Sequence, residues 1–396
     1  MLATTPRAAT AERWLAVGRS QDPDPAMAGR EAASEALEHA DARLLIVFCS
    51  DRYRLDELLA GFNERSGGIP LIGCSTAGEI AADGPGDAGV VVTAIGGEGF
   101  TVRTASAEGA SARLREAGAE VALAASELEP EAHRILLLLT DGLAGDQQEI
   151  VRGAYGVLGA EVPLVGGCAG DDLRMEATHQ LSGDRVLTDA VVAAALSSTA
   201  PFGIGVRHGW RKVGEPMLVT QSAENRVFEL DDEPALDVYL ERLEAPPETH
   251  ADGAAFTRFA LTHPLGLSRR TGEEQVRLVA EASFDDRSLG CIAEVPEGGL
   301  AWFMEGDAGS VLDATDAACG DALAGLGGRP PLGLLAFDCI ARRGVLGDAG
   351  IVSEVARVER HADGAPIAGF YTYGEIARRR GVSGFHNQTL VVLALG

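Results

Sequence analysis

The sequence predicts an α/β protein with mixed β-sheets, built from repeated strand–helix–strand–strand units and arranged as two related domains. A recurring stretch carries the prediction: IPLIGCSTAGEIA at 69–81 and APIAGFYTYGEIA at 365–377 agree at seven positions in one register. A third version, VPLVGGCAGDD at 162–172, keeps the Pro, the apolar pair and the Gly, and reaches Gly170-Asp171 one residue early. Such recurrence indicates a duplicated supersecondary element, and 396 residues exceed one ordinary core.

Strand and helix signals alternate around the first copy and predict one complete unit. Continuous apolar runs predict buried strands, and mixed apolar and charged runs predict covering helices. The expected elements are strands at 12–18, 44–49, 70–73 and 89–95, helices at 26–39 and 53–64, and a turn at 82–88. The two strands around the second helix are expected to be parallel through a right-handed crossover, and the last strand antiparallel.

The same order of signals returns around the other two copies. The second unit is expected to contain helices at 111–128 and 146–158 and strands at 135–139, 162–166 and 190–196. The third is expected to contain strands at 334–337, 365–369 and 389–395 and a helix at 349–361. Both units therefore place their recurring stretch directly after a helix, as the first does.

Residues between the second and third units follow a different pattern. Short alternating runs joined by turn signals predict an antiparallel meander, with strands at 202–207, 217–221, 275–281, 288–294 and 299–305 and helices at 233–243 and 308–325. We therefore expect one domain at 1–200 with two units, and a second at 201–396 with the meander and the third unit.

Composition narrows the possible partners and the compartment. The formal net charge of −26 repels phosphate backbones and anionic lipids, so we expect neither nucleic-acid nor membrane binding. No apolar run approaches the ~20 residues that span a bilayer, and the first residues lack the apolar core of a signal peptide. Six Cys occur without a CxxC pair, which suits a reducing compartment. We expect a soluble cytoplasmic protein.

Several motifs, in this order along the chain, resemble those of the FIST family, whose halves are called FIST N and FIST C. They are DPDPAMAGREA (22–32), PLIGCSTAGEI (70–80), PLVGGCAGDD (163–172), GVRHGWRKVGEPMLVT (205–220), VPEGG (295–299), and GFYTYGEI with FHNQT (369–389). The resemblance covers nearly the whole chain. It implies a pair of sensory domains that bind a small ligand, amino acids among the candidates, and signal to kinases, cyclases or chemotaxis machinery.

The recurring stretch also suggests a binding site from its residue types. Small residues after a strand let a ligand approach the backbone, successive N–H groups hold an anion, and a nearby acid accepts an ammonium group. The candidate ligand-binding residues are Cys74, Ser75, Thr76, Gly78, Glu79, Gly167, Cys168, Gly170, Asp171, Tyr371, Tyr373, Gly374, Glu375, His386 and Asn387. The alternative is that Gly-Glu-Ile forms a tight turn, with its acid bonded to backbone N–H and its Ile in the core.

Two alternatives concern single side chains. Cys74 and Cys168 occupy positions where a nucleophile can sit, although Phe370 replaces Cys74 in the last copy. Small core residues explain both cysteines as well, so we expect no catalytic residue and no metal site. His386 in the FHNQT motif either ligates haem iron or pins its loop.

The expected function is that of a sensor of an amino-acid-like ligand or small anion, signalling to a separate protein such as a histidine kinase or chemoreceptor. Some stand-alone bacterial members of the FIST family resemble this chain in size and are thought to be haem-based nitric oxide sensors that regulate a separate histidine kinase, so a haem cofactor is the second hypothesis. A cysteine- or carboxylate-dependent enzyme is the third.

Overall fold

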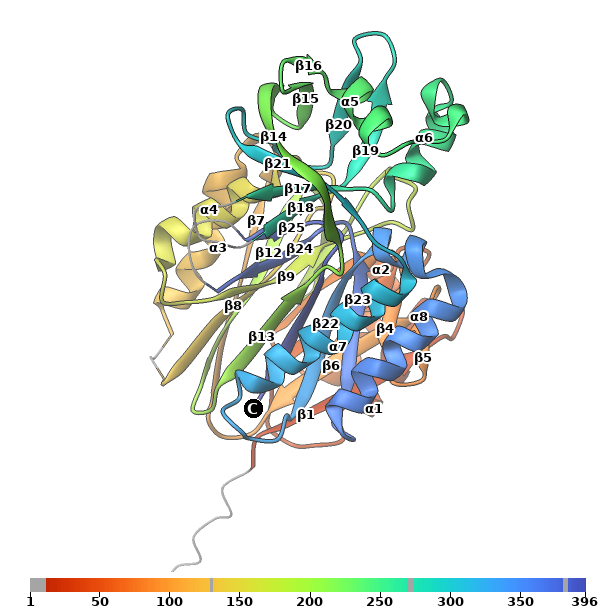
Figure 1. Cartoon of the computed structure of the whole chain (residues 1–396). Coiled ribbons are helices and arrows are strands. Elements are labelled where there is room, and N and C mark those ends of the chain that lie inside the picture. The colour runs from red at the N-terminus through yellow and green to blue at the C-terminus, as the bar shows by residue number, and fades with distance from the viewer. Residues whose placement is uncertain (1–11, 129–130, 269–273, 380–383) are drawn as a thin grey trace, which may run out of the picture.

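The computed structural model describes residues 12–128, 131–268, 274–379 and 384–396. Strands and helices alternate along the chain, and the strands form mixed sheets, which confirms the predicted α/β class. The body of the molecule consists of three repeats that share one order of elements, and a separate lobe is inserted into the third repeat (Figure 1).

The first repeat runs from residue 14 to residue 96. Its elements are β1 (Trp14–Ser20), α1 (Pro25–Ala36), β2 (Ala42–Ser50), α2 (Leu55–Ser66), β3 (Leu71–Thr76), β4 (Glu79–Ala81), β5 (Gly84–Gly86) and β6 (Val90–Gly96). Strands β2 and β3 are parallel, and β6 pairs antiparallel with β2, as predicted. The expected turn at 82–88 contains the short strand β5, which forms a hairpin with β4.

The second repeat follows the same order. Its elements are β7 (Phe100–Glu108), α3 (Leu114–Ser126), β8 (His133–Thr140), α4 (Gln147–Leu158), β9 (Leu164–Cys168), β10 (Gln180–Ser182), β11 (Arg185–Leu187) and β12 (Ala190–Ser198), with a short 3₁₀ helix at Ala110–Ala112. Strand β7, which the sequence analysis missed, is half-buried and carries small and polar residues, so it lacks a continuous apolar run.

The third repeat begins with β13 (Phe202–Arg207) and ends with β26 (Leu390–Leu395). Between them lie α7 (Ala308–Ala324), β22 (Gly333–Cys339), α8 (Ile340–Ala362), β23 (Ile367–Thr372), β24 (Glu375–Arg378) and β25 (Phe385–His386). The prediction of β13 as part of the meander is wrong, because β13 pairs with β26 in the repeat's own sheet. Helix α8 starts nine residues earlier than predicted and kinks at Gly347, where φ is +63°.

The inserted lobe spans residues 211–305 and stands at one end of the body (Figure 1). It contains β14 (Arg211–Ala223), β15 (Arg226–Leu230), β16 (Glu233–Pro234), α5 (Ala235–Arg242), α6 (Gly253–Ala260), β17 (Leu265–Ser268), β18 (Glu274–Arg277), β19 (Val279–Ser283), β20 (Ser288–Cys291) and β21 (Leu300–Glu305), with a 3₁₀ helix at Pro247–His250. All its strand pairings are antiparallel, as the meander predicted.

The three repeats exchange their hairpins in a closed ring. Hairpin β4–β5 of the first repeat pairs with β23 of the third, and hairpin β10–β11 of the second pairs with β3 of the first. Hairpin β24–β25 of the third pairs with β9 of the second. Each sheet therefore takes its edge from another repeat, and β23 in the second predicted domain is paired with a strand from the first. The predicted division at residue 200 falls between β12 and β13 and stays a prediction.

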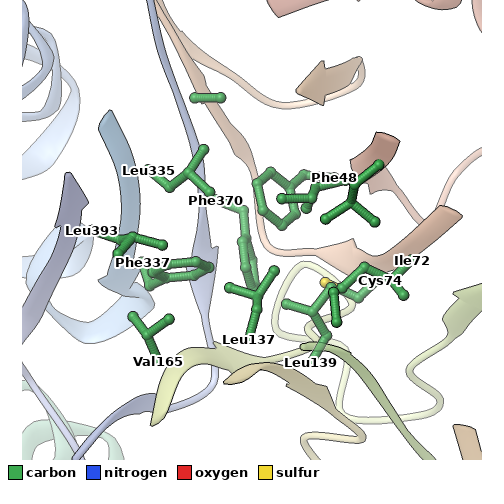
Figure 2. Packing of buried hydrophobic residues seen from close by; sticks show 14 of the residues in the cluster. Phe48, Ile72, Cys74, Leu137, Leu139, Val165, Leu335, Phe337, Phe370 and Leu393 are labelled. Carbon is green, nitrogen blue, oxygen red and sulfur yellow. The ribbon is translucent and has the colours of Figure 1, made fainter. Parts of the chain in front are cut away.

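A shared hydrophobic core lies where the three sheets face one another (Figure 2). Phe48 of β2, Phe337 of β22 and Phe370 of β23 meet there, with ring centroids 4.7–6.2 Å apart. The opposite face of each sheet packs on its own helices, so both faces of the central strands are buried. Burial on both faces explains why these strands read as continuous apolar runs.

Candidate functional site

The acids of the recurring stretch hold short turns together. Glu79 accepts hydrogen bonds from the Thr76 hydroxyl (2.5 Å) and from the N–H of Gly89 (3.1 Å). Glu375 accepts equivalent bonds from the Thr372 hydroxyl (2.5 Å) and from the N–H of Thr389 (3.1 Å). Each acid therefore ties the start of its hairpin to the residue before the closing strand, which is the turn interpretation of the motif.

Burial changes the acidity of both turn acids. Desolvation raises the pKa of Glu79 to about 8, against the opposing hydrogen bond from Thr76. It raises the pKa of Glu375 to about 7, against the hydrogen bonds from Thr372 and Thr389. Glu79 lines a cavity of about 410 Å³, whereas the side chain of Glu375 is fully buried. The structure does not bring these acids together around one cavity.

The third equivalent of these acids is Gln180, not Asp171. Gln180 opens hairpin β10–β11 opposite Cys74, as Glu79 opens its hairpin opposite Phe370 and Glu375 opposite Gly167. Its Oε1 accepts from the N–H of Ala190 at 3.2 Å, which repeats the bond to the closing strand. The prediction that Asp171 of the stretch at 162–172 corresponds to Glu79 and Glu375 was wrong, because residues 169–179 form an additional loop in the second repeat.

Asp171 organises that additional loop. Its carboxylate accepts hydrogen bonds from the Tyr373 hydroxyl and from the N–H groups of Met175 (3.0 Å), Glu176 (2.7 Å) and Ala177 (3.1 Å). Desolvation opposes ionisation, but these four donors outweigh it and lower the pKa of Asp171. Asp171 is therefore a fixed anion that holds the loop against the third repeat.

The small residues of the motif serve close packing. A Cβ on Gly73, Gly166 or Gly369 would lie within 2.6 Å of a carbonyl oxygen on the neighbouring strand. Ser75 donates to the carbonyl of Gly170 (2.8 Å) and accepts from the N–H of His179 (2.9 Å), which fastens the additional loop at both ends. These contacts account for the recurrence of small residues without a ligand.

The remaining candidates within the strands and turns are enclosed by protein. Cys74 and Cys168 are fully buried, and burial raises the pKa of both thiols, so neither is an activated nucleophile. Tyr371 is also fully buried, beneath the Arg343 guanidinium. Three glycines complete this group: Gly78 lies against Arg343, Gly167 against Thr372 and Gly374 against the Phe385 ring.

One larger cavity lies where the body meets the inserted lobe. Its volume is about 830 Å³, within the range of small-molecule sites. The body contributes residues after the carboxyl ends of β8, β22 and β23, together with the additional loop, and the lobe contributes residues 224–225, 278 and 292–294. Carboxyl ends of strands are the usual ligand sites of α/β sheets. Of the predicted site residues, Tyr373 and Asn387 line this cavity.

The cavity combines an apolar surface with an acidic border. Leu173, Met175 and Ile292 are exposed at 61%, 57% and 42% although they are large and apolar. Arg152 of α4 pairs with Glu149 on the same helix and, at 3.4 Å, with Glu294 of the inserted lobe. This ion pair joins the two walls of the cavity.

Sequence reasoning missed most residues of this cavity. The lobe residues lie more than 60 positions after α4 in the sequence, so no local motif joins them to it. The available signal was the strand end at Thr140-Asp141-Gly142, which places Gly142 at the cavity. Asp146 could also have been found, because it is the first residue of the helix predicted at 146–158 and an acid at the start of a helix is a typical N-cap. In the structure it caps α4 by accepting from the N–H of Gln148 at 2.9 Å.

The structure places His386, the predicted axial haem ligand, away from the large cavity. Its Nε2 lies 3.0 Å from the carbonyl oxygen of Ala377. In the described ranges, no group of three or more His, Cys, Asp or Glu is arranged to hold a metal ion.

Within those same ranges, no helix is both long and apolar enough to cross a bilayer.

Comparison with known protein families decides the relationship. The FIST N domain model matches residues 43–233 and the FIST C domain model matches residues 235–378. The chain belongs to the FIST family. FIST domains are sensory domains that bind ligands and act in signal transduction, rather than catalytic domains. The family assignment confirms the resemblance that the motifs indicated.

Proteins similar to this chain are identical to it at about a quarter of the aligned residues. Two uncharacterized proteins of Mycobacterium tuberculosis, from strains H37Rv and CDC 1551, are each 26% identical over 388 residues, covering 95% of this chain and 97% of theirs. An uncharacterized protein of Methanocaldococcus jannaschii is 26% identical over 266 residues, covering 62% of this chain. The match spans about half the length of that archaeal protein.

Proposed function

We propose that this FIST protein is a cytoplasmic sensor that binds a small molecule in the cavity between the body and the inserted lobe. The observation that carries the proposal is the cavity itself, with exposed apolar residues on both of its walls: Leu173 and Met175 on the body, Ile292 on the lobe. Exposed apolar groups gathered at a cavity are typical of a site that is covered when occupied.

The position of the cavity suggests how binding becomes a signal. A ligand that touches both walls favours the arrangement of lobe and body in which both sets of contacts form. The Arg152–Glu294 pair already joins the walls across this boundary. We propose that a separate signalling protein, such as a histidine kinase or chemoreceptor, reads the resulting position of the lobe.

A ligand screen with a blocked cavity tests the proposal. Small molecules that raise the melting temperature of the wild type are identified first, since binding to the folded state stabilises it by mass action. They are then tested on Ile292→Trp, which places a large side chain at the cavity. Leu300→Trp is the matched control, because Leu300 is also exposed on the lobe, at 46%, but lies outside the cavity lining.

We expect a ligand to raise the melting temperature by several degrees in the wild type and in Leu300→Trp. Ile292→Trp should lose most of that rise while keeping the melting temperature of the unliganded protein. An equal rise in both variants would place the site elsewhere. A broad screen without any stabilising compound would contradict the proposed function as a whole.

A further inference from the structure

The inserted lobe is joined to the body by two short connections that lie against each other. Residues 208–210 lead from β13 of the body into β14 of the lobe, and residues 306–307 lead from β21 back to α7 (Figure 1). Strands β14 and β21 pair directly beyond these connections, with Arg211 opposite Glu305. Both connections therefore leave the body at one place, which we call the joint.

Trp210 occupies the centre of the joint. It is buried, and a Cβ on Gly306 would lie 2.4 Å from its ring, so the leaving connection passes directly against the indole. The turn before it is also fixed, because the His208 Nδ1 accepts from the N–H of Trp210 at 3.0 Å and Gly209 has a φ of +86°. The indole ring therefore contacts both the entering and the leaving connection.

The FHNQT segment of the body, residues 385–389, holds the joint. The Trp210 Nε1 donates to the carbonyl of Gln388 at 3.1 Å. The Gln388 side chain continues to the lobe, where its Nε2 donates to the carbonyl of Leu261, the residue after α6, at 2.7 Å. Gln388 has a φ of +53°, a conformation that few residues other than Gly adopt and that persists only where surrounding contacts enforce it.

The same segment connects the joint to the large cavity. From the lobe, the Gln275 Nε2 donates to the carbonyl of Phe385 at 2.6 Å. From the body, the N–H of Cys339 donates to the carbonyl of Thr389 at 3.2 Å. Cys339 and Asn387 both line the cavity. The segment that holds the lobe is therefore also part of the cavity wall.

Arg342 holds the entering connection from a second part of that wall. It follows residues 340–341, which line the cavity, and its guanidinium donates to the carbonyl of His208 at 3.2 Å. Arg342 is fully buried between the carboxyl groups of Asp338 and Glu354. Its removal would leave buried acids without their cation, so the test below uses other residues of the joint.

We propose that Trp210 is the pivot of the lobe, and that its hydrogen bond to Gln388 holds the lobe in the orientation that forms the cavity. This inference rests on the proposed function and names how that site is regulated. A ligand that presses on the FHNQT segment shifts the Gln388 carbonyl and turns the lobe about the indole. Hinges of this kind need only a few residues that absorb the change in backbone angles. Trp210 and Gln388 are positioning residues in this device.

Two spin labels on the whole protein report the orientation of the lobe. All six native Cys are buried, so introduced surface Cys can be labelled selectively. Glu241→Cys on α5 of the lobe and Val352→Cys on α8 of the body form the reporting pair, and both positions are exposed. Val352→Cys with Leu123→Cys on α3 is the control pair within the body. Double electron–electron resonance measures the distribution of distances for each pair.

Trp210→Phe keeps an aromatic ring in the joint and removes its N–H donor. Gln388→Met keeps the length of the side chain and removes its donor to the lobe. We expect each to widen the distance distribution of the reporting pair at least twofold and to leave the control pair unchanged. Trp14→Phe is the matched control and should change neither, because the Trp14 Nε1 likewise donates to a carbonyl, that of Ala40, at 3.1 Å, but in the first repeat.

Ile292→Trp tests the link between cavity and lobe without a ligand. The introduced indole occupies part of the cavity, so we expect the mean distance of the reporting pair to shift. Leu300→Trp, outside the cavity lining, should leave that distance unchanged. Equal distances in these two variants would overturn the link between the cavity and the lobe.

The outcomes separate this inference from the proposed function. An unchanged reporting pair in Trp210→Phe overturns the pivot even if a ligand of the cavity is found, and Gln388→Met decides the matter if Trp210→Phe does not fold. Equal widening in Trp14→Phe, or in the control pair, would show a general loosening and also overturns it. If the joint variants behave as expected but no compound stabilises the protein, the pivot stands and the proposed sensor function is wrong.

Discussion

The turn of the second repeat differs from the turns of the first and third, and the difference coincides with the cavity. In the first and third repeats, two residues separate the recurring strand from its hairpin, and a buried Glu closes the turn. In the second, residues 169–179 intervene and Gln180 takes the place of the acid. That additional loop supplies Leu173 and Met175 to the cavity.

This comparison separates architecture from function within one motif. The shared features, a Gly beside the neighbouring strand and a polar side chain that holds the closing strand, build the exchanged hairpins. The feature that only the second repeat has lies where a ligand is expected. In a repeated structure, the copy that departs from the pattern is therefore the better guide to a site.

The largest expected effect comes from the acid that fixes the additional loop. Asp171→Asn removes the charge and one of the two oxygens that accept from Tyr373 and three backbone N–H groups. We expect the free energy of unfolding to fall by about 3 kcal/mol, since hydrogen bonds to a charged group contribute ~1.5–3 kcal/mol each. Chemical denaturation of the variant measures this change.

Asp172→Asn is the neighbouring control for Asp171. Asp172 pairs with Arg52 at 2.8 Å at the surface, where such pairs contribute about 0–1 kcal/mol. Equal losses in the two variants would show that Asp171 does not organise the loop, and would remove the distinction drawn between the repeats.

The next effect concerns the pH dependence of the two Glu turns. Because burial raises the pKa of Glu79 to about 8 and of Glu375 to about 7, the folded state holds protons that the unfolded state releases near pH 4.5. Their contribution is complete below pH 4.5 and is lost as the pH rises toward 8. We expect the double variant Glu79→Gln, Glu375→Gln to lose less stability than the wild type between pH 5 and pH 8.5.

Gln180 shows that an amide suits this turn position, so the double variant should fold. Each pKa unit corresponds to 1.36 kcal/mol, and the difference between the two proteins at pH 8.5 should be on the order of a few kcal/mol. Denaturant titrations at several pH values provide the measurement. Parallel stability curves for the two proteins would mean that the turn acids are ionised throughout.

The smallest effect is the reverse exchange in the second repeat. Gln180→Glu should introduce a new buried acid with a raised pKa, because position 180 is fully buried. We expect little change in stability at pH 5 and a loss of about 1–2 kcal/mol at pH 8.5. If the variant is equally stable at both pH values, the environment of the second turn differs from that of the other two.

The sequence was sufficient for the features that local pattern determines. Buried strands such as β2 and β8 have apolar residues on both faces, so their runs were visible. Strand β7 was not, because its polar and small residues give no such run. The parallel pairing of the strands on either side of each crossover helix was predicted correctly. The exchange of hairpins was not, since a short strand such as β4 carries no signal for the strand with which it pairs.

The candidate site was harder to predict from the sequence than the fold, for a physical reason. Glu79 and Glu375 could be picked out from the sequence because a buried acid in a tight turn limits which residues can stand beside it. This agrees with the turn interpretation of the motif. Asp171 was assigned to the wrong position because an additional loop shifts the register of the second copy. The cavity depends on side chains such as Ile292 and Glu294, which reach it only through the tertiary position of the lobe.

The closed exchange of hairpins has a consequence for synthesis on the ribosome. The sheet of the second repeat receives its edge from β24, which is translated about 200 residues after β9. Until then, the exposed edge of β9 is a template for another chain. The nascent protein therefore depends on protection during elongation, and its final assembly waits for the third repeat to emerge.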